Sequence, residues 1–86
     1  MANYSILLTR SAAKELGRVP TKDRRRLVAR IAALADDPRP MGAEKLSGAN
    51  KYRVRQGDYR ILCVIEDAVL VVTVVRVGNR RDVYRG

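Results

Sequence analysis

The sequence contains no histidine and a single cysteine, Cys63, among its 86 residues. Without histidine, no Ser-His-Asp or Cys-His arrangement can form, and neither can a metal site built on imidazole. One cysteine cannot make an intrachain disulfide, and Cys63 falls on the apolar side of a predicted strand, where a thiol packs as a small apolar group. These absences exclude most hydrolase mechanisms as well as histidine and thiolate metal centres. They favour a reducing, cytoplasmic setting.

Acidic residues are also scarce, nine against eighteen Lys and Arg residues. The two acidic pairs, Asp36-Asp37 and Glu66-Asp67, fall where a helix end and a turn are predicted, so we interpret them as solvated turn formers rather than as a metal site or a glycosidase pair. No glycine-rich phosphate loop, bilayer-spanning apolar run or signal-peptide layout is present. We therefore predict a soluble protein that uses no metal and no cofactor and does not span a membrane.

The abundance of Lys and Arg gives a net charge of +9. Such a balance indicates an extended anionic partner, which charge alone leaves open among nucleic acid, an anionic membrane surface and an acidic protein. The length predicts a single small domain, residues 1–86, with a core of only two packed layers.

Two helices are predicted in the first half of the chain. The first is capped by Thr9 or Ser11 and ends near Gly17, and the second begins near Thr21 and ends at Asp36-Asp37-Pro38. The residues expected to face inward have the spacing of amphipathic helices. They are Ala12, Ala13 and Leu16 in the first helix and Leu27, Val28, Ile31, Leu34 and Ala35 in the second.

Alternating or valine-rich runs predict four strands. They cover Tyr4 to Thr9, Lys51 to Gln56, Tyr59 to Ile65 and Val69 to Val77. Residues 39–50 are predicted to form a loop with a turn of helix around Glu44 to Leu46. The order is β-α-α-β-β-β, which predicts an α+β domain with both helices on one face of a mainly antiparallel four-stranded sheet.

The stretch KYRVRQGDYR, Lys51 to Arg60, predicts a hairpin with cations on one face. Gly57 suits the first central position of a type II′ turn, which needs a positive φ. With Gln56 opposite Tyr59, Arg55 lies opposite Arg60, and directly opposed residues share a face. One face then carries Lys51, Arg53, Arg55 and Arg60, and the other carries Tyr52, Val54, Tyr59, Ile61 and Cys63. Opposed like charges repel, so this pairing indicates either a solvated face or an anionic ligand.

A second basic cluster, RVGNRRDVYR, follows the valine-rich strand. Because that strand is expected to pair with the second hairpin strand, the tail should emerge near Arg60. Several arginines around one point suit a phosphate, since each guanidinium donates in a fixed fork and keeps its charge. Tyr84, the one tyrosine without a predicted core role, adds a hydroxyl and a face for stacking a base. Further RNA contacts are expected from Lys51, Arg76, Arg81 and Arg85.

The element order, the hairpin YRVRQGDYRI and the ending VGNRRDVY resemble the RelE/ParE superfamily of bacterial toxins, and within it RelE, over nearly the whole chain. The hairpin motif indicates the fold. The ending discriminates better, because RelE-type members are similar in placing an arginine after the last strand and a tyrosine a few residues on, as Arg80 and Tyr84 do here. ParE-type members, which inhibit DNA gyrase, generally lack that set.

The resemblance implies a toxin of a type II toxin-antitoxin system that is neutralised by a RelB-like antitoxin. It implies that the toxin is a metal-independent endoribonuclease that cuts messenger RNA on the ribosome. The positive charge of this chain predicts that the antitoxin is acidic. The resemblance also implies attack of a ribose 2′-oxygen on the adjacent phosphate. The residues that match the family's catalytic positions are Arg53, Arg55, Arg60, Arg80 and Tyr84. Arg60 and Arg80 would stabilise charge on phosphorus, Arg55 would orient the phosphate, and Tyr84 would stack on or hydrogen-bond the nucleotide.

The sequence departs from the best-known RelE at Arg53 and Arg55, which stand where that toxin has lysines. A lysine can lose its proton among other cations, whereas a guanidinium keeps it. Lys51, the only nearby lysine on the same predicted face, is therefore a possible general base. Alternatively, catalysis relies on alignment, with the ribosome holding the 2′-oxygen in line.

Plainer interpretations stand beside these. Taken alone, Arg53, Arg55 and Arg60 indicate a solvated sheet face protected against edge pairing. For Arg24, Arg25, Arg26 and Arg30 a solvated helix face is favoured over contact with ribosomal RNA. At the level of function, the alternatives are a ParE-like gyrase inhibitor and an inactive toxin-fold protein that acts in a repressor complex.

Overall fold

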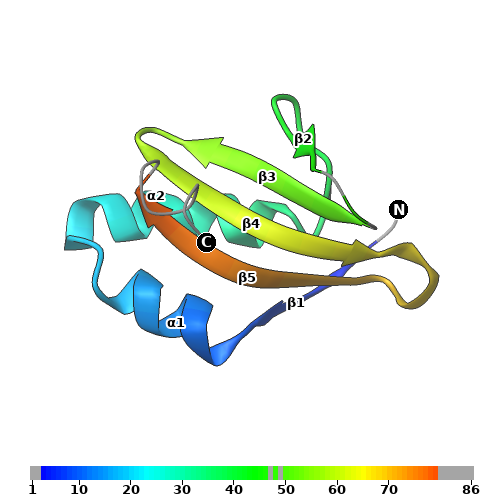
Figure 1. The fold of residues 1–86 in the computed structure, drawn as a ribbon, viewed down its shortest axis with the longest axis horizontal. Helices are drawn as coiled ribbons and strands as arrows, with labels where there is room; N and C mark the ends of the chain where they lie inside the picture. The colour runs from blue at the N-terminus through cyan, green and yellow to red at the C-terminus, as the bar shows by residue number, and fades with distance from the viewer. Residues whose placement is uncertain (1–2, 47, 49, 80–86) are drawn as a thin grey trace.

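A five-stranded sheet in the order β1-β5-β4-β3-β2 forms the body of the fold, with two helices on one of its faces (Figure 1). The computed structural model describes residues 3–46, 48 and 50–79. The elements are β1 Ser5–Leu8, α1 Arg10–Gly17, α2 Thr21–Ala33, β2 Glu44–Lys45, β3 Lys51–Gln56, β4 Tyr59–Glu66, the 3-10 turn η1 Asp67–Val69 and β5 Val71–Asn79. β1 runs parallel to β5, and the other pairs are antiparallel. The predicted fold is confirmed, with one strand more than predicted.

That additional strand is β2, which corrects the predicted turn of helix around Glu44 to Leu46. Glu44 pairs with Arg53 and Lys45 with Tyr52, and the Leu46 amide donates to the Lys51 carbonyl at 2.9 Å. Two residues of strand have no periodicity that a sequence pattern can reveal. Their conformation is set by the edge of β3, a tertiary contact that outweighs local preference.

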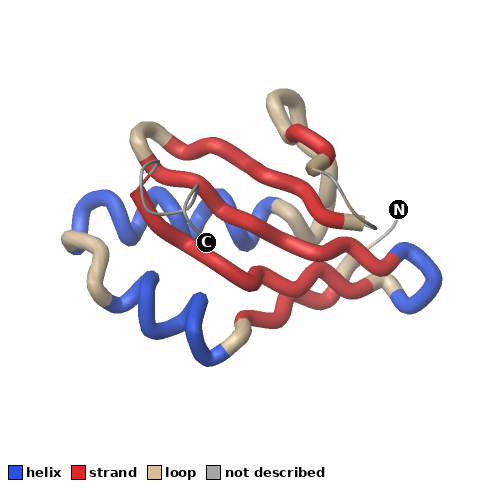
Figure 2. The backbone as a smooth tube through the Cα atoms, in the orientation of Figure 1, coloured by secondary structure: helices blue, strands red, loops and turns tan. Residues whose placement is uncertain are grey.

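β5 lies inside the sheet between β1 and β4, and its neighbours are β4, β1 and α1. β4 pairs with it along its whole length, whereas β1 reaches only from Val71 to Val74. Beyond Val74 the neighbour on that side is α1, whose N-cap Thr9 donates to the Val74 carbonyl at 3.0 Å through its amide and to the Val75 carbonyl at 3.2 Å through its hydroxyl. The same hydroxyl accepts from the Ala12 amide at 3.1 Å and caps the helix. Figure 2 shows this change of neighbour where the chain leaves β1 and enters α1.

The core lies between the helices and the sheet. Its buried members are Ala12, Val19, Leu27, Ile31, Leu34, Val54, Ile61, Cys63, Ile65, Val72, Val74 and Val77. The predicted apolar face of the hairpin is confirmed, since Val54, Ile61 and Cys63 are buried and the two hairpin tyrosines pack against the core.

Two residues expected to face inward do not. Ala13 is exposed, and Val28 is 48% exposed. α1 has only eight residues, about 12 Å of helix, so it leaves part of the apolar stripe of α2 uncovered. The result is an apolar hollow of about 470 Å³ between the helices and β1, lined by Ile6, Leu8, Leu16, Val28, Ile31, Ala32 and Ala35. Neither helix in the described part of the chain has the length and apolarity to cross a membrane.

Candidate anion-binding site

The β3–β4 hairpin has the predicted register. Gln56 pairs with Tyr59, and Arg55 lies directly opposite Arg60. Gly57 has a φ of 59°, in the left-handed region that the predicted turn requires at this position. The period of two along each strand then places the cations on the face of the sheet that points away from the helices.

On this outer face, residues form rows across three strands. Arg55, Arg60 and Gly78 form one row, and Arg53, Leu62 and Arg76 form the next. β5 therefore ends beside Arg60, at the Gly57 end of the sheet, as expected. The predicted catalytic residues Arg80 and Tyr84 and the predicted RNA-binding residues Arg81 and Arg85 lie outside the described residues.

Arg60 is the most unusual residue of this face because it is charged and only 4% exposed. Its Nη1 donates to the carbonyl of the adjacent Tyr59 at 3.4 Å, and its Nε has no hydrogen-bond partner among the described residues. A buried guanidinium normally has its donors satisfied, because an unmet charged donor costs free energy. Arg60 thus places a positive charge with an unsatisfied, buried Nε donor in the outer face of the sheet.

Glu44 of β2 lies on the same face and was missed by the sequence reasoning. Its Oε2 is 2.7 Å from Nη2 of Arg53, and its Oε1 is 3.4 Å from Nη2 of Arg55. The bond from Arg53, with further attraction from Arg55 and Arg60, holds the pKa of Glu44 below its usual range. No sequence pattern indicates this contact, because it depends on the pairing of β2 with β3. That pairing was not predicted.

Lys51 and Arg76 lie farther from the centre of the face. Lys51 pairs with Val64, four residues along β3 from Arg55, which is about 13 Å of strand. Arg76 reaches around the edge of the sheet to α1, where its Nε donates to Glu15 at 3.3 and 3.0 Å. The structure therefore brings Arg53, Arg55 and Arg60 together, with Lys51 and Arg76 at the margin.

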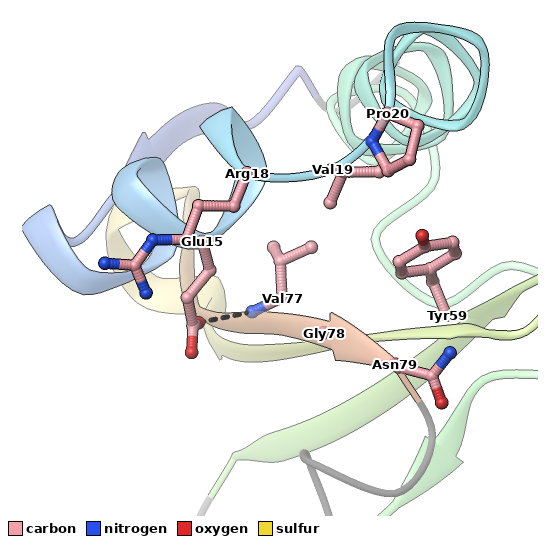
Figure 3. A pocket seen from close by; sticks show the side chains of 8 residues that line it. All are labelled: Glu15, Arg18, Val19, Pro20, Tyr59, Val77, Gly78 and Asn79. Carbon is pink, nitrogen blue, oxygen red and sulfur yellow. Dashed lines mark hydrogen bonds between the residues drawn. The ribbon is translucent and has the colours of Figure 1, made fainter.

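The opposite, helix-facing side has a pocket of about 410 Å³ at the end of β5, shown in Figure 3. It is lined by Glu15, Arg18, Val19, Pro20, Tyr59, Val77, Gly78 and Asn79. The Glu15 carboxylate already accepts from the Val77 amide at 2.9 Å. None of the arginines of the outer face lines this pocket, so we assign the candidate anion site to the outer face instead.

The described residues of the outer face offer fixed positive charge and hydrogen-bond donors. Three guanidinium groups come from two adjacent strands, which hold their backbones rigidly, and one carboxylate partly offsets their repulsion. Such a set suits a phosphate, which accepts from several planar forks at once. Within the described ranges, no group of three His, Cys, Asp or Glu side chains is placed to hold a metal ion.

Comparisons with known proteins agree with the overall fold. The family model "ParE toxin of type II toxin-antitoxin system, parDE" matches residues 6–84. Toxin RelG of Mycobacterium tuberculosis is 29% identical over 88 residues, which cover 95% of this chain and 97% of that protein.

Solved structures with the same fold include chains of a bacterial and of an archaeal complex. A chain of the archaeal RelE-RelB complex from Pyrococcus horikoshii matches with a TM-score of 0.82 and 26% identity, covering 93% of this chain and 97% of that one. A chain of the toxin-antitoxin complex RelBE2 from Mycobacterium tuberculosis matches with a TM-score of 0.76 and 27% identity, covering 91% and 99%.

Proposed function

The chain belongs to the ParE toxin family of type II toxin-antitoxin systems and is a RelE-like toxin, and we propose that it is a metal-independent endoribonuclease that cuts messenger RNA on the ribosome. The observation that carries this proposal is the pairing of Arg55 with the buried Arg60 on one face of the hairpin, with β5 ending beside them. Direct opposition of two cations is unfavourable unless an anion offsets it, and the Glu44 carboxylate, 3.4 Å from Arg55, offsets it only in part. A phosphodiester of RNA is such an anion.

The proposed reaction is an internal transesterification. The ribose 2′-oxygen attacks the adjacent phosphorus, a bond from this oxygen to phosphorus forms, and the bond from phosphorus to the 5′-oxygen breaks. The products are a 2′,3′-cyclic phosphate and a 5′-hydroxyl. The proton of the 2′-hydroxyl leaves to a base, and a proton is delivered to the departing 5′-oxygen, so the reaction is balanced without metal or cofactor.

The residues divide into roles by their chemistry. Arg60 and Arg80 stabilise the charge that develops on the phosphorane, Arg55 orients the phosphate, and Tyr84 stacks on or hydrogen-bonds the nucleotide. Removing one such preorganised donor typically costs on the order of 10²–10³ in rate. Lys51 stands about 13 Å along β3 from the row of Arg55 and Arg60, which favours alignment by the ribosome over Lys51 as the source of catalysis.

An acidic, RelB-like antitoxin is the proposed partner. Both solved relatives described above are complexes of this kind, and the net charge of +9 suits an acidic segment that folds on binding and covers the outer face. The ribosome and messenger RNA are the proposed targets in the cytoplasm when the antitoxin is absent.

Cleavage on translating ribosomes tests the proposal. The purified protein should produce new message ends, and both Arg80→Ala and Tyr84→Ala should abolish them. Arg25→Ala is the matched control, since it removes one positive charge from the exposed side of α2, away from the outer face. Intact message with the wild type, or equal cleavage by Arg80→Ala and the control, would contradict the assignment.

A ParE-like gyrase inhibitor is the second candidate, because the family model that matches is that of ParE toxins. It predicts inhibition of DNA supercoiling by gyrase that the antitoxin reverses. Supercoiling and message cleavage measured with the same preparation separate the two functions. A protein that does neither, yet binds operator DNA with its antitoxin, fits the role of an inactive toxin-fold protein in a repressor complex.

A further inference from the structure

Glu44 is a carboxylate set among three arginines, and no step of the reaction above uses it. It bridges Arg53 and Arg55 with one oxygen to each, at 2.7 and 3.4 Å. β2 lies on the far side of β3 from β4. Glu44 therefore attracts the two β3 arginines toward the edge of the sheet, away from Arg60 on β4.

The two arginines differ in how they are held. Arg53 has a short bond to Glu44, and its side chain is 12% exposed, whereas Arg55 is at the limit of hydrogen-bond distance with its side chain 59% exposed. A short, shielded, charge-assisted bond is hard to exchange. A long, solvated ion pair contributes little and is exchanged readily.

Arg55, the more loosely held of the two, is also the one that lies nearer Arg60. Arg55 shares a row with Arg60, whereas Arg53 shares its row with Leu62. A phosphate that binds the Arg60 guanidinium is thus in the same row as Arg55, and Arg53 is one row away with its Nη2 bound to Glu44.

We propose that Glu44 is a positioning residue for the phosphate site, which keeps Arg53 as a permanent partner and holds Arg55 until an RNA phosphate takes its place. In the free protein, Glu44 offsets the repulsion between Arg55 and Arg60. When RNA binds, Arg55 exchanges the carboxylate for phosphate, and Arg53 stays with Glu44 and does not contact the RNA. This inference rests on the proposed function for its ligand and reduces the phosphate-binding set of the hairpin to Arg55 and Arg60.

The test uses a fluorescent 2′-O-methyl oligoribonucleotide, which cannot be cut, and measures its affinity for the full chain over a range of salt concentrations without ribosomes. Glu44→Gln should bind roughly fivefold more tightly than wild type at low salt, because a competing negative charge is removed beside the site. Glu66→Gln is the matched control, since it removes one exposed charge at the far end of β4. A role of Glu44 in folding alone would not raise affinity.

The salt dependence distinguishes the two arginines. Each phosphate contact on a single strand contributes about 0.7 to the slope of log affinity against log salt. For Arg55→Gln, the slope should be smaller than that of wild type by about this amount, and the affinity should be at least tenfold lower. For Arg53→Gln, the slope should equal that of wild type. Thermal melts of each variant establish that it is folded at the assay temperature.

The inference is overturned if Glu44→Gln binds no more tightly than Glu66→Gln, if Arg53→Gln and Arg55→Gln lose affinity and slope equally, or if neither wild type nor Glu44→Gln binds the probe at low salt. The outcome is separable from the proposed function. The expected binding pattern without message cleavage rejects the ribonuclease alone, and cleavage without this pattern rejects only the role of Glu44.

Discussion

Arg39 and Asp67, which are 28 residues apart, form a two-pronged ion pair in which Nη1 and Nη2 donate to Oδ1 and Oδ2 at 3.1 and 2.8 Å. The Tyr4 hydroxyl donates to the same carboxylate at 2.6 Å. The Arg39 guanidinium also lies 4.9 Å from the centre of the Tyr52 ring, a cation–π distance. One carboxylate thus joins the N-terminal segment, the loop after α2 and the turn before β5.

The bonds from Arg39 and then Tyr4 hold the pKa of Asp67 below its usual range. A group whose pKa is lowered by folding contributes stability above its unfolded pKa, about 4, and loses it as pH falls through the lower folded value. We therefore expect Asp67→Asn to lower Tm at pH 6, by about 5 °C at most because the pair is exposed. The difference from wild type should shrink as pH falls below about 4. Circular dichroism melts across this range measure it, with Asp36→Asn as a control, and a difference that does not change with pH would contradict it.

Leu70 has a φ of 55° and a ψ of 52°, left-handed values that cost a residue with a Cβ roughly 1–2 kcal/mol. Glycine removes this cost, but its greater conformational freedom in the unfolded chain reduces the gain in stability by about 0.5–1 kcal/mol. Because the side chain is 41% exposed, Leu70→Gly should stabilise the fold by up to about 1 kcal/mol in urea unfolding. The neighbouring Val69→Gly, where φ is negative, should destabilise it. The same sign for both variants would argue against strain at Leu70.

Cys63 is buried, and burial raises the pKa of its thiol to about 11. Since the thiolate is the reactive form, Ellman's reagent at pH 8 should label the native protein only as fast as it opens. The unfolded protein in urea should react at once. Rapid labelling of the native protein would show that β4 is accessible at this point.

Glu15 should matter more to stability than its partner Arg76. Its carboxylate accepts from the amide of Val77, a buried residue, and from the Arg76 guanidinium. Glu15→Ala leaves that amide without an acceptor, which costs about 1–3 kcal/mol. Arg76→Ala removes only a partly exposed ion pair, whose side chains are 34% and 26% exposed and which is worth at most about 1 kcal/mol. Glu15→Gln, which keeps an acceptor oxygen, should recover most of the loss. Equal losses in the free energy of unfolding for Glu15→Ala and Arg76→Ala, measured in urea, would mean that the ion pair stabilises the fold and that the hydrogen bond from the Val77 amide does not.

Binding to ribosomes should weaken steeply with salt, because each phosphate contact releases counterions. Sedimentation of the protein with ribosomes between about 50 and 200 mM salt measures the effect, and affinity should fall by several orders of magnitude if six or more phosphates are contacted. Binding that is insensitive to salt would count against an RNA-facing basic surface.

The hairpin could be predicted residue by residue because a period of two and a turn glycine together determine its register. Glu44 could not, since its contact with Arg53 depends on a two-residue strand that forms only against β3. Val28 fits the apolar stripe of α2 as well as Leu27 does, and only the short length of α1 decides that it stays exposed. The burial of Arg60 contradicts its residue type and is visible only in the assembled sheet.

The placement of α1 beside the last residues of β5 has a consequence for self-association. Where β1 ends, β5 would otherwise present bare amides and carbonyls, the template on which a second molecule adds a strand and fibres grow. Thr9 donates hydrogen bonds to the carbonyls of Val74 and Val75, and the Glu15 carboxylate accepts one from the amide of Val77. A helix of eight residues thus keeps the strand that leads into the proposed active site from becoming a seed for aggregation.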